Sequence, residues 1–249
     1  LLHEDLATYP GVNPAHVHGN ICAQSVVAWG DVEAGFRQAG HIFEHTFTTS
    51  TVHQSYLEPM ATVVRYEPGG KLTIWTSTQG TYVVRSRVAS LLGLPMHKVR
   101  VIVPHVGGGF GGKLQTVLEP YCALLAQRTG RPVKIVMSRE EEFFLGKPRS
   151  AGVLHLKTGV TRDGLLVARQ ARMYFDTGFA CHPRSSEIAP TSVRGPYNIP
   201  HVRFEAYSVY TNKMGCACFR GPDGIQAPFA GESQIDIICR ELGMDPIAF

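Results

Sequence analysis

The sequence feature with the clearest chemical potential is a glycine-rich stretch, GGGFGGKL, from Gly107 to Leu114. Five glycines in six positions give a backbone that can adopt positive φ and bring its N–H groups against a ligand. The β-branched run Val99 to Val103 before it is typical of a buried strand. A helical pattern follows the loop, with its apolar face formed by Val117, Leu118, Tyr121, Leu124 and Leu125. Because such a loop would combine free amides with a helix N-terminus, the sequence predicts a site for an anionic or oxyanionic group.

Two nucleotide-binding motifs can be fitted to this loop, and each lacks a required residue. The glycines satisfy GxGxxG, but the candidates for an acidic ribose ligand about 20 positions on are basic: Arg131, Lys134 and Arg139. The stretch also satisfies GxxxxGK, yet Leu114 stands where a P-loop needs a hydroxyl group for magnesium. A phosphate- or nucleotide-binding module and a purely structural turn stay open as alternatives.

Two other segments place polar side chains where predicted elements end. The strand-like run KLTIWTSTQ closes with a polar cluster that includes Gln79, and the late turn GCACFRGPDG contains Arg220. Taken alone, these residues have ordinary structural roles. Gln79 would cap a strand end, Phe110 would pack in the core, and Arg220 would form a surface ion pair.

The elements that must position these residues alternate irregularly between strands and helices. Helices are expected at residues 31–39, with Asp31 as N-cap, around 84–92, directly after the glycine loop, from the capping box at 138–141, and through 235–242. Alternating patterns predict strands at 41–49, 61–66, 71–79, 99–103, 133–137, 153–160, 165–175 and 202–212, with glycine turns at 67–70 and 163–164. The predicted fold class is therefore α+β, with mixed sheets and packed helices.

Residues 1–24 are rich in Pro, Gly, Asn and His and predict a linker or arm, so that residues 25–249 form the domain. The proline-rich residues 176–201 predict an irregular loop. The histidines at 3, 16 and 18 lack a further clustered ligand, so no metal site is predicted there.

Composition argues against several functions. The net charge of +4 comes from scattered residues without a basic block, which argues against nucleic acid, and no apolar run approaches the roughly 20 residues of a membrane span. Six cysteines without paired CxxC motifs indicate reduced, mostly buried thiols and a cytoplasmic protein.

The order of the motifs resembles the molybdenum-cofactor-binding subunit of the xanthine dehydrogenase and aldehyde oxidase family, the molybdenum hydroxylases. The resemblance rests on STQG at 77–80, GGGFGGK at 107–113 and FRG at 219–221. It extends along the chain through HQSYLEP at 53–59, TGRPVKIVMSREEEF at 129–143 and ELGMDP at 241–246. It implies the first part of the family's molybdopterin-binding region.

In that family a pterin dithiolene holds the molybdenum, so no protein metal ligands are expected. The resemblance implies that Gln79 is catalytic and hydrogen-bonds an oxygen ligand of the metal. The loop would approach the cofactor at Gly109, Phe110 and Gly111, and Arg220 would lie beside it. The cofactor would be molybdopterin or its cytosine dinucleotide.

Departures from the family pattern concern the substrate pocket. Leu114 replaces the Glu that follows GGGFGGK in purine hydroxylases, and Pro222 replaces an aromatic residue that stacks on the substrate. The segment EIAPTS also lacks a substrate-orienting Arg. Xanthine is therefore a poor candidate substrate. Gly221 stands where the carbon monoxide oxidising branch carries Cys, which argues against that reaction.

The resemblance leaves out the family's preceding domain and the later segment that carries its general base, a Glu. We therefore expect a fragment or one subunit of a split enzyme, inactive alone, that inserts water-derived oxygen into a heterocycle or aldehyde carbon. The expected partners are the remaining half of this subunit and iron–sulfur and FAD-containing subunits or domains. A non-catalytic scaffold domain is a further alternative.

Overall fold

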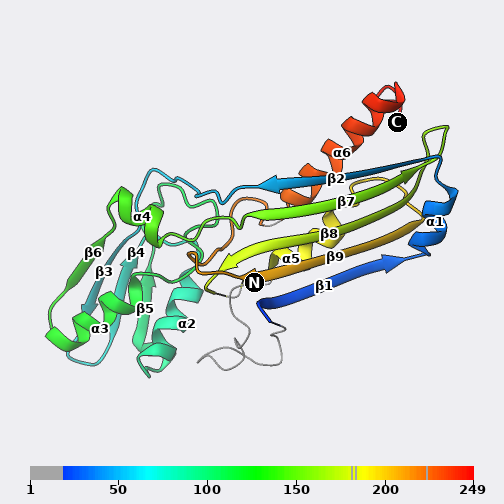
Figure 1. The fold of residues 1–249 in the computed structure, drawn as a ribbon. Coiled ribbons are helices and arrows are strands. Elements are labelled where there is room, and N and C mark those ends of the chain that lie inside the picture. Colours follow the sequence, from blue (N-terminus) through cyan, green and yellow to red (C-terminus); the bar gives the residue numbers. More distant parts are fainter. Residues whose placement is uncertain (1–18, 181, 183, 223) are drawn as a thin grey trace. The chain divides into compact units, whose positions relative to one another are not determined.

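The computed structural model describes residues 19–180, 182, 184–222 and 224–249. The chain divides into two compact units (Figure 1). Unit 1 comprises Leu1–Val52, Arg149–Ala217 and Gly221–Phe249, and unit 2 comprises His53–Pro148 and Cys218–Arg220. Each unit has its own sheet and its own hydrophobic core.

Unit 1 contains a five-stranded sheet in the order β1-β9-β8-β7-β2 (Figure 1). Its strands are β1 (Ile21–Trp29), β2 (His41–Thr49), β7 (Gly152–Val160), β8 (Leu166–Gly178) and β9 (His201–Tyr210). β8 and β9 pair in parallel, and the other pairs are antiparallel. The helices are α1 (Val32–Gln38), α5 (Arg184–Ser192) and α6 (Gln226–Leu242), of which α5 packs on β1, β8 and β9, and α6 on β2 and β7.

Strand alternation builds the core of unit 1, because successive side chains point to opposite faces of a sheet. Leu154, Met173 and Phe204 are fully buried on one face, in the same cluster as Ala189 of α5 and Ala230 of α6. The cross-strand neighbours on the other face are polar and charged, as in the row Thr46, His155, Arg172 and Glu205. The helices therefore cover one face of this sheet.

Unit 2 contains a four-stranded sheet in the order β5-β4-β3-β6 (Figure 1). Its strands are β3 (Ala61–Tyr66), β4 (Leu72–Thr76), β5 (Val99–Ile102) and β6 (Val133–Val136). Its helices are α2 (Thr81–Leu91), the 3₁₀ helix η3 (Met96–Lys98), α3 (Glu119–Thr129) and α4 (Arg139–Leu145). Val64 and Ile74 of the sheet are buried with Val84 and Val88 of α2 and Ala123 of α3.

Strand directions in unit 2 bring several loops to one edge. β4 and β5 are parallel, and β3 runs antiparallel to both β4 and β6. Consequently the carboxyl ends of β4, β5 and β6 and the start of β3 share one edge, which we call the carboxyl edge of unit 2. The segments that carry Gln79 and the glycine loop both leave the sheet there.

The α+β class with mixed sheets is confirmed, as are many local predictions. Asp31 caps α1 by accepting hydrogen bonds from the N–H groups of Glu33 and Ala34. The predicted capping box of α4 is present, with the Ser138 hydroxyl accepting from Glu141 N–H. Both hairpins with glycine turns form.

Three predictions about elements were wrong. β1 begins at Ile21, so the predicted arm over 1–24 ends in a strand, while residues 1–18 lie outside the described residues. α5 occupies part of the segment predicted as an irregular loop, because Ser185 and Ala189 bury its inner face. Helix α3 begins only at Glu119, and it buries Cys122, Ala123 and Ala126 rather than the larger side chains of Tyr121, Leu124 and Leu125.

We predict that Phe204→Ala lowers the free energy of unfolding by about 3–5 kcal/mol, since it leaves a cavity in the core of unit 1. Leu165→Ala is the control, because Leu165 is 62% exposed and its truncation should cost less than about 0.5 kcal/mol. Urea unfolding followed by circular dichroism measures both. Equal losses in the two variants would contradict this assignment of the core.

Candidate functional site

Gln79, the glycine loop and Arg220 meet at the carboxyl edge of unit 2. The Gln79 Oε1 atom accepts hydrogen bonds from Gly111 N–H at 2.9 Å and Lys113 N–H at 3.3 Å. The Arg220 N–H donates to the carbonyl oxygen of Phe110 at 2.9 Å. The structure therefore joins residues that are far apart in the sequence, and the parallel pairing of β4 and β5 explains why Gln79 reaches the loop.

Four hydrogen-bond donors at this point lack an acceptor among the residues that the structure describes. They are the Nε2 amide of Gln79, whose side chain is exposed, and the backbone N–H groups of Gly108, Gly109 and Phe110, of which only Phe110 belongs to an exposed residue. Phe110 is held at φ 51°, a left-handed conformation that is uncommon for a bulky residue, and its side chain is 47% exposed. Strained backbone of this kind persists where surrounding contacts enforce it, and it is often found at functional sites.

At several glycines of the loop, neighbouring protein atoms occupy the space that a Cβ atom would need. A Cβ atom on Gly109 would lie 2.5 Å from Gln79 Oε1, and one on Gly111 would lie 2.5 Å from the carbonyl oxygen of Cys218. Gly112 similarly faces Gln54 and Tyr56. The loop therefore needs glycine because neighbouring segments press against it from inside unit 2.

Two parts of the predicted anion cradle are corrected by the structure. The helix α3 starts well after Leu114, so its N-terminus does not directly follow the loop. The Gly111 amide, predicted to face a ligand, donates to Gln79 instead. The amides of Gly108, Gly109 and Phe110 have no acceptor among the described residues, and Phe110 is the exposed residue of the three, next in sequence to the Gly111 amide that bonds Gln79.

The ammonium group of Lys113 is not available to bind a phosphate. Its side chain is fully buried, and its Nζ atom lies 2.7 Å from Glu58 Oε2. The ammonium group also lies 4.7 Å from the centroid of the Tyr56 ring. A P-loop lysine must reach the phosphates of its ligand, so this geometry disfavours that alternative.

The two residues predicted to line the substrate pocket fall in different units. Leu114 is 36% exposed in unit 2. Pro222 is half-buried and belongs to unit 1. Their joint role in a pocket stays a prediction.

The segment 53–59 contacts the glycine loop, but no individual role was predicted from the sequence for its residues. Gln54 Nε2 donates to the carbonyl oxygens of Lys147 and Cys218, at 2.8 and 2.9 Å. Glu58 bonds both Gly107 and Lys113. The signal that could have identified them is topological, since this segment enters β3 at the same edge where β4 and β5 end.

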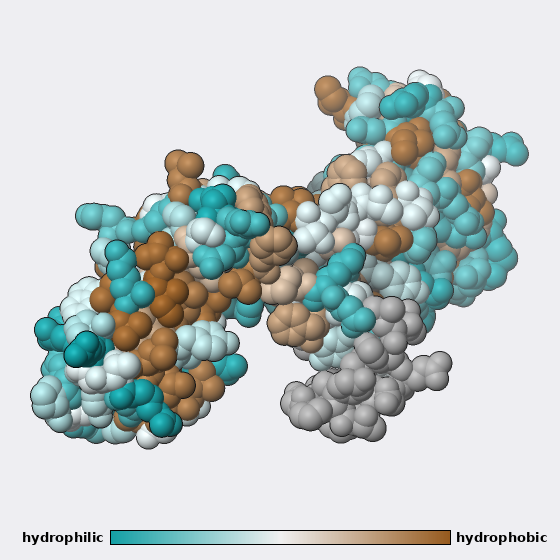
Figure 2. Space-filling model, turned by 60° about the vertical axis from the view of Figure 1, so that its left-hand side comes forward, coloured by the Kyte–Doolittle hydropathy of each residue, from teal (hydrophilic) through white to brown (hydrophobic). Residues whose placement is uncertain are grey.

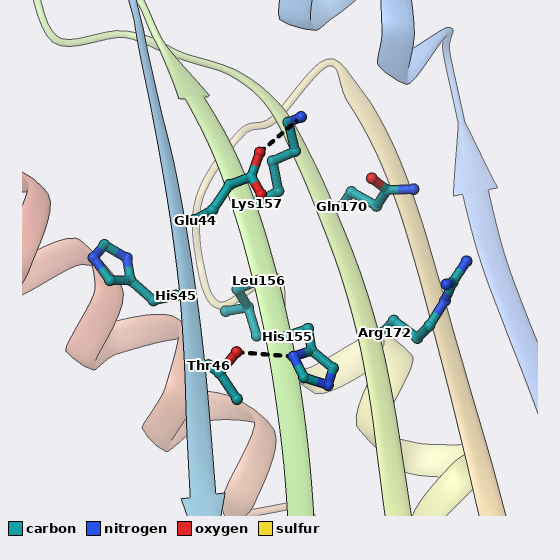
Figure 3. Close-up of a pocket in the computed structure, with 8 residues that line it drawn as sticks. All are labelled: Glu44, His45, Thr46, His155, Leu156, Lys157, Gln170 and Arg172. Carbon is teal, nitrogen blue, oxygen red and sulfur yellow. Dashed lines mark hydrogen bonds and ion pairs between the residues drawn. The ribbon is translucent and has the colours of Figure 1, made fainter.

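A separate hollow of about 410 Å³ lies on the open sheet face of unit 1 (Figure 3). It contains the ion pair of Glu44 and Lys157, at 2.9 Å, and a 2.8 Å hydrogen bond between Thr46 and His155. None of the predicted site residues lines it. Among the described residues, no cluster of three or more His, Cys, Asp or Glu is arranged to hold a metal ion.

The topology of unit 2 and its outward donors define a domain that can bind an oxygen-rich group. Residues 14–249 match the family model described as "Molybdopterin cofactor-binding domain". The chain belongs to this family.

The relatives of known activity that this chain matches are longer than it is. It is 41% identical over 235 residues to the nicotinate dehydrogenase large molybdopterin subunit of Eubacterium barkeri, covering 93% of this chain and 55% of that protein. It is 33% identical over 239 residues to the xanthine dehydrogenase molybdenum-binding subunit of Escherichia coli, covering 94% and 32%. The chain therefore spans about half the length of the nicotinate dehydrogenase subunit and about a third of the length of the xanthine dehydrogenase subunit.

Solved structures agree with this family. Quinoline 2-oxidoreductase from Pseudomonas putida 86 superposes with a TM-score of 0.86 at 28% identity, over 92% of this chain and 30% of that one. Aldehyde oxidoreductase from Desulfovibrio gigas superposes with a TM-score of 0.83 at 26% identity, over 96% and 26%.

We predict that Gly111→Ala destabilises the chain by about 2–4 kcal/mol, because its Cβ would clash with the Cys218 carbonyl at positive φ. Gly93→Ala is the matched control. Gly93 also has positive φ, but a Cβ there meets nothing within 4 Å, so the cost should be about 1 kcal/mol. Urea unfolding compares the two, and equal costs would refute the steric argument.

A second prediction concerns acid stability. Burial raises the pKa of the Glu58 carboxyl, but hydrogen bonds from Lys113 and Gly107 lower it more, so that the net pKa lies below 4.5. A lowered folded pKa stabilises the native state above pH 4.5, and this contribution is lost as pH falls through the folded value.

We therefore expect the free energy of unfolding of Glu58→Gln to fall less steeply than that of the wild type below about pH 4.5. Urea unfolding at a series of pH values measures the slope. Glu44→Gln, at an exposed ion pair, is the control. Identical slopes for the wild type and Glu58→Gln would exclude this role of Glu58.

Proposed function

We propose that this chain is the first part of the molybdenum-binding subunit of a multi-component molybdenum hydroxylase. The enzyme would insert water-derived oxygen at an electrophilic carbon of a heterocycle or an aldehyde. A heterocycle is favoured, since the relatives named above include proteins named for nicotinate, xanthine and quinoline. Leu114 argues against a purine.

One observation carries this proposal: Gln79 and Phe110 are both exposed, and each has an N–H donor without an acceptor among the described residues. The oxygen ligands of a molybdenum–pterin centre are hydrogen-bond acceptors, so a carboxamide N–H and a backbone N–H on two segments joined by the Gln79–Gly111 hydrogen bond suit them. The inward bonds of Gln79 Oε1 fix its orientation and leave Nε2 as the outward atom. The residues present therefore fit the cofactor.

When bound, the cofactor supplies the two-electron chemistry, and the residues of this chain hold and orient it. Gln79 would donate from Nε2, and the Phe110 N–H would donate beside it. Arg220, held by its own N–H to the Phe110 carbonyl, would bring a cation to the same place. The matched region covers only 55% and 32% of the two relatives, so we propose that the rest of the subunit supplies the general base and that residues 1–249 alone lack turnover.

The surface of unit 2 supports the proposal of further partners. Figure 2 shows hydrophobic residues gathered in a band on the visible face of unit 2, on the left. The exposed side chains of α3 and α4 include Tyr121, Leu125, Phe143 and Phe144, between 48% and 68% exposed. Exposed apolar groups of this size are typical of surfaces that contact other polypeptides.

These polypeptides would be the rest of the molybdenum-binding subunit and the iron–sulfur and FAD-containing components. We place the enzyme in the cytoplasm, which agrees with the free thiols of Cys122, Cys218 and Cys239 in the described part of the chain. No helix in the described part of the chain has the length and apolar character needed to cross a membrane.

The proposal is tested by Gln79→Ala in the assembled enzyme. Removing a donor to the reacting centre should lower the turnover rate per bound molybdenum by about 10²–10³-fold. Gln38→Ala, at an exposed glutamine at the end of α1, is the control and should retain wild-type turnover. Molybdenum analysis normalises the rates.

Three results would contradict the proposal. Unchanged turnover in Gln79→Ala and Arg220→Ala would favour a scaffold domain. Wild-type enzyme without molybdenum, stabilised by ATP or NAD, would favour the nucleotide-binding module. Turnover by the isolated chain supplied with cofactor would refute the need for a partner.

A further inference from the structure

The carboxylate of Glu58 connects the two ends of the glycine loop. Its Oε2 atom accepts a hydrogen bond from Gly107 N–H at 2.8 Å and from Lys113 Nζ at 2.7 Å. The Glu58 N–H in turn donates to the Gly107 carbonyl oxygen at 3.1 Å. Because Gly107 opens the GGGFGGK sequence and Lys113 closes it, one oxygen atom fixes the separation of the loop ends.

Lys113 extends this connection to the outward donors. Its side chain points inward, while its carbonyl oxygen accepts hydrogen bonds from Gln79 N–H and from the Thr78 hydroxyl, both at 2.9 Å. Its own N–H donates to Gln79 Oε1. The position of the Gln79 side chain is thus tied to the same residue that pairs with Glu58.

A buried ammonium group is costly unless it is paired. Lys113 is fully buried, and its charge is matched by Glu58 and by the face of the Tyr56 ring. Tyr56 is itself fixed, since its hydroxyl donates to Glu142 at 2.5 Å and Arg139 donates to its carbonyl oxygen at 2.7 Å. The pair therefore has a rigid support in α4.

We propose that Glu58 and Lys113 are positioning residues for the cofactor. Their ion pair holds the loop in the conformation that presents the Phe110 amide next to Gln79. The part of this inference that concerns the cofactor rests on the proposed function. The part that concerns the loop rests on the contacts within unit 2 alone.

The test uses Lys113→Met and Glu58→Gln, singly and together. The control is Lys157→Met, which removes a Lys–Glu pair of similar length, 2.9 Å, from the open face of unit 1 (Figure 3). The first measurement is hydrogen exchange in the full chain. The hydrogen-bonded amides of the loop, those of Gly107, Gly111, Gly112 and Lys113, should exchange at least about tenfold faster in each variant, while amides of α2 and α3 change less than about twofold.

The second measurement is the molybdenum content of the assembled enzyme. Each single variant should retain less than about half of the wild-type molybdenum, and the double variant should resemble the single ones, since the residues act as a unit. Lys157→Met should match the wild type in both measurements.

Each other result overturns a defined part of the inference. Unchanged exchange in the loop, or equal acceleration in α2 and α3, would show that the pair does not fix the loop. Faster exchange with full molybdenum content would show that the loop is fixed but does not position the cofactor. A wild-type enzyme that lacks molybdenum would refute the proposed function, while the exchange data would still decide the role of the pair.

Discussion

The parallel pairing of β4 with β5 is the constraint on which the site depends. Trp75 lies opposite Ile102, so the two strands end together and their following segments leave the sheet side by side. One segment carries Gln79 and the other carries the glycine loop. An antiparallel pairing would send these segments to opposite edges, and the hydrogen bonds of Gln79 with Gly111 and Lys113 would be lost.

Local sequence signals predicted many of the elements because their causes are local. Asp31, the Ser138 capping box and the glycine turns act within a few residues, so they can be recognised without knowing the fold. Helix α5 was missed because its burial depends on the sheet of unit 1. The face of α3 was mistaken because small residues, Ala123 and Ala126, fit against the sheet where larger ones do not.

The candidate site likewise combines features that can be predicted from local sequence with features that depend on the fold. The residue types at Gln79, Phe110 and Arg220 could be selected from motif order, but their contacts could not. The inward donation of the Gly111 amide and the burial of Lys113 follow from segments distant in sequence, above all residues 53–60. A charged residue in a glycine loop is normally interpreted as a ligand-binding group. Lys113 is instead buried and paired with Glu58, so it supports the loop from within the protein.

The glycines of this loop therefore act on a bound group only indirectly, by allowing protein atoms to pack against the loop. Cβ positions at Gly107, Gly109 and Gly111 are filled by Glu58, Gln79 and Cys218, which fix the backbone from within. This leaves the outward side to a strained Phe110, an exposed carboxamide and Leu114. Lys113 points inward and Leu114 is exposed, so under the proposed function the residue at position 114 could vary with the substrate without loosening the loop.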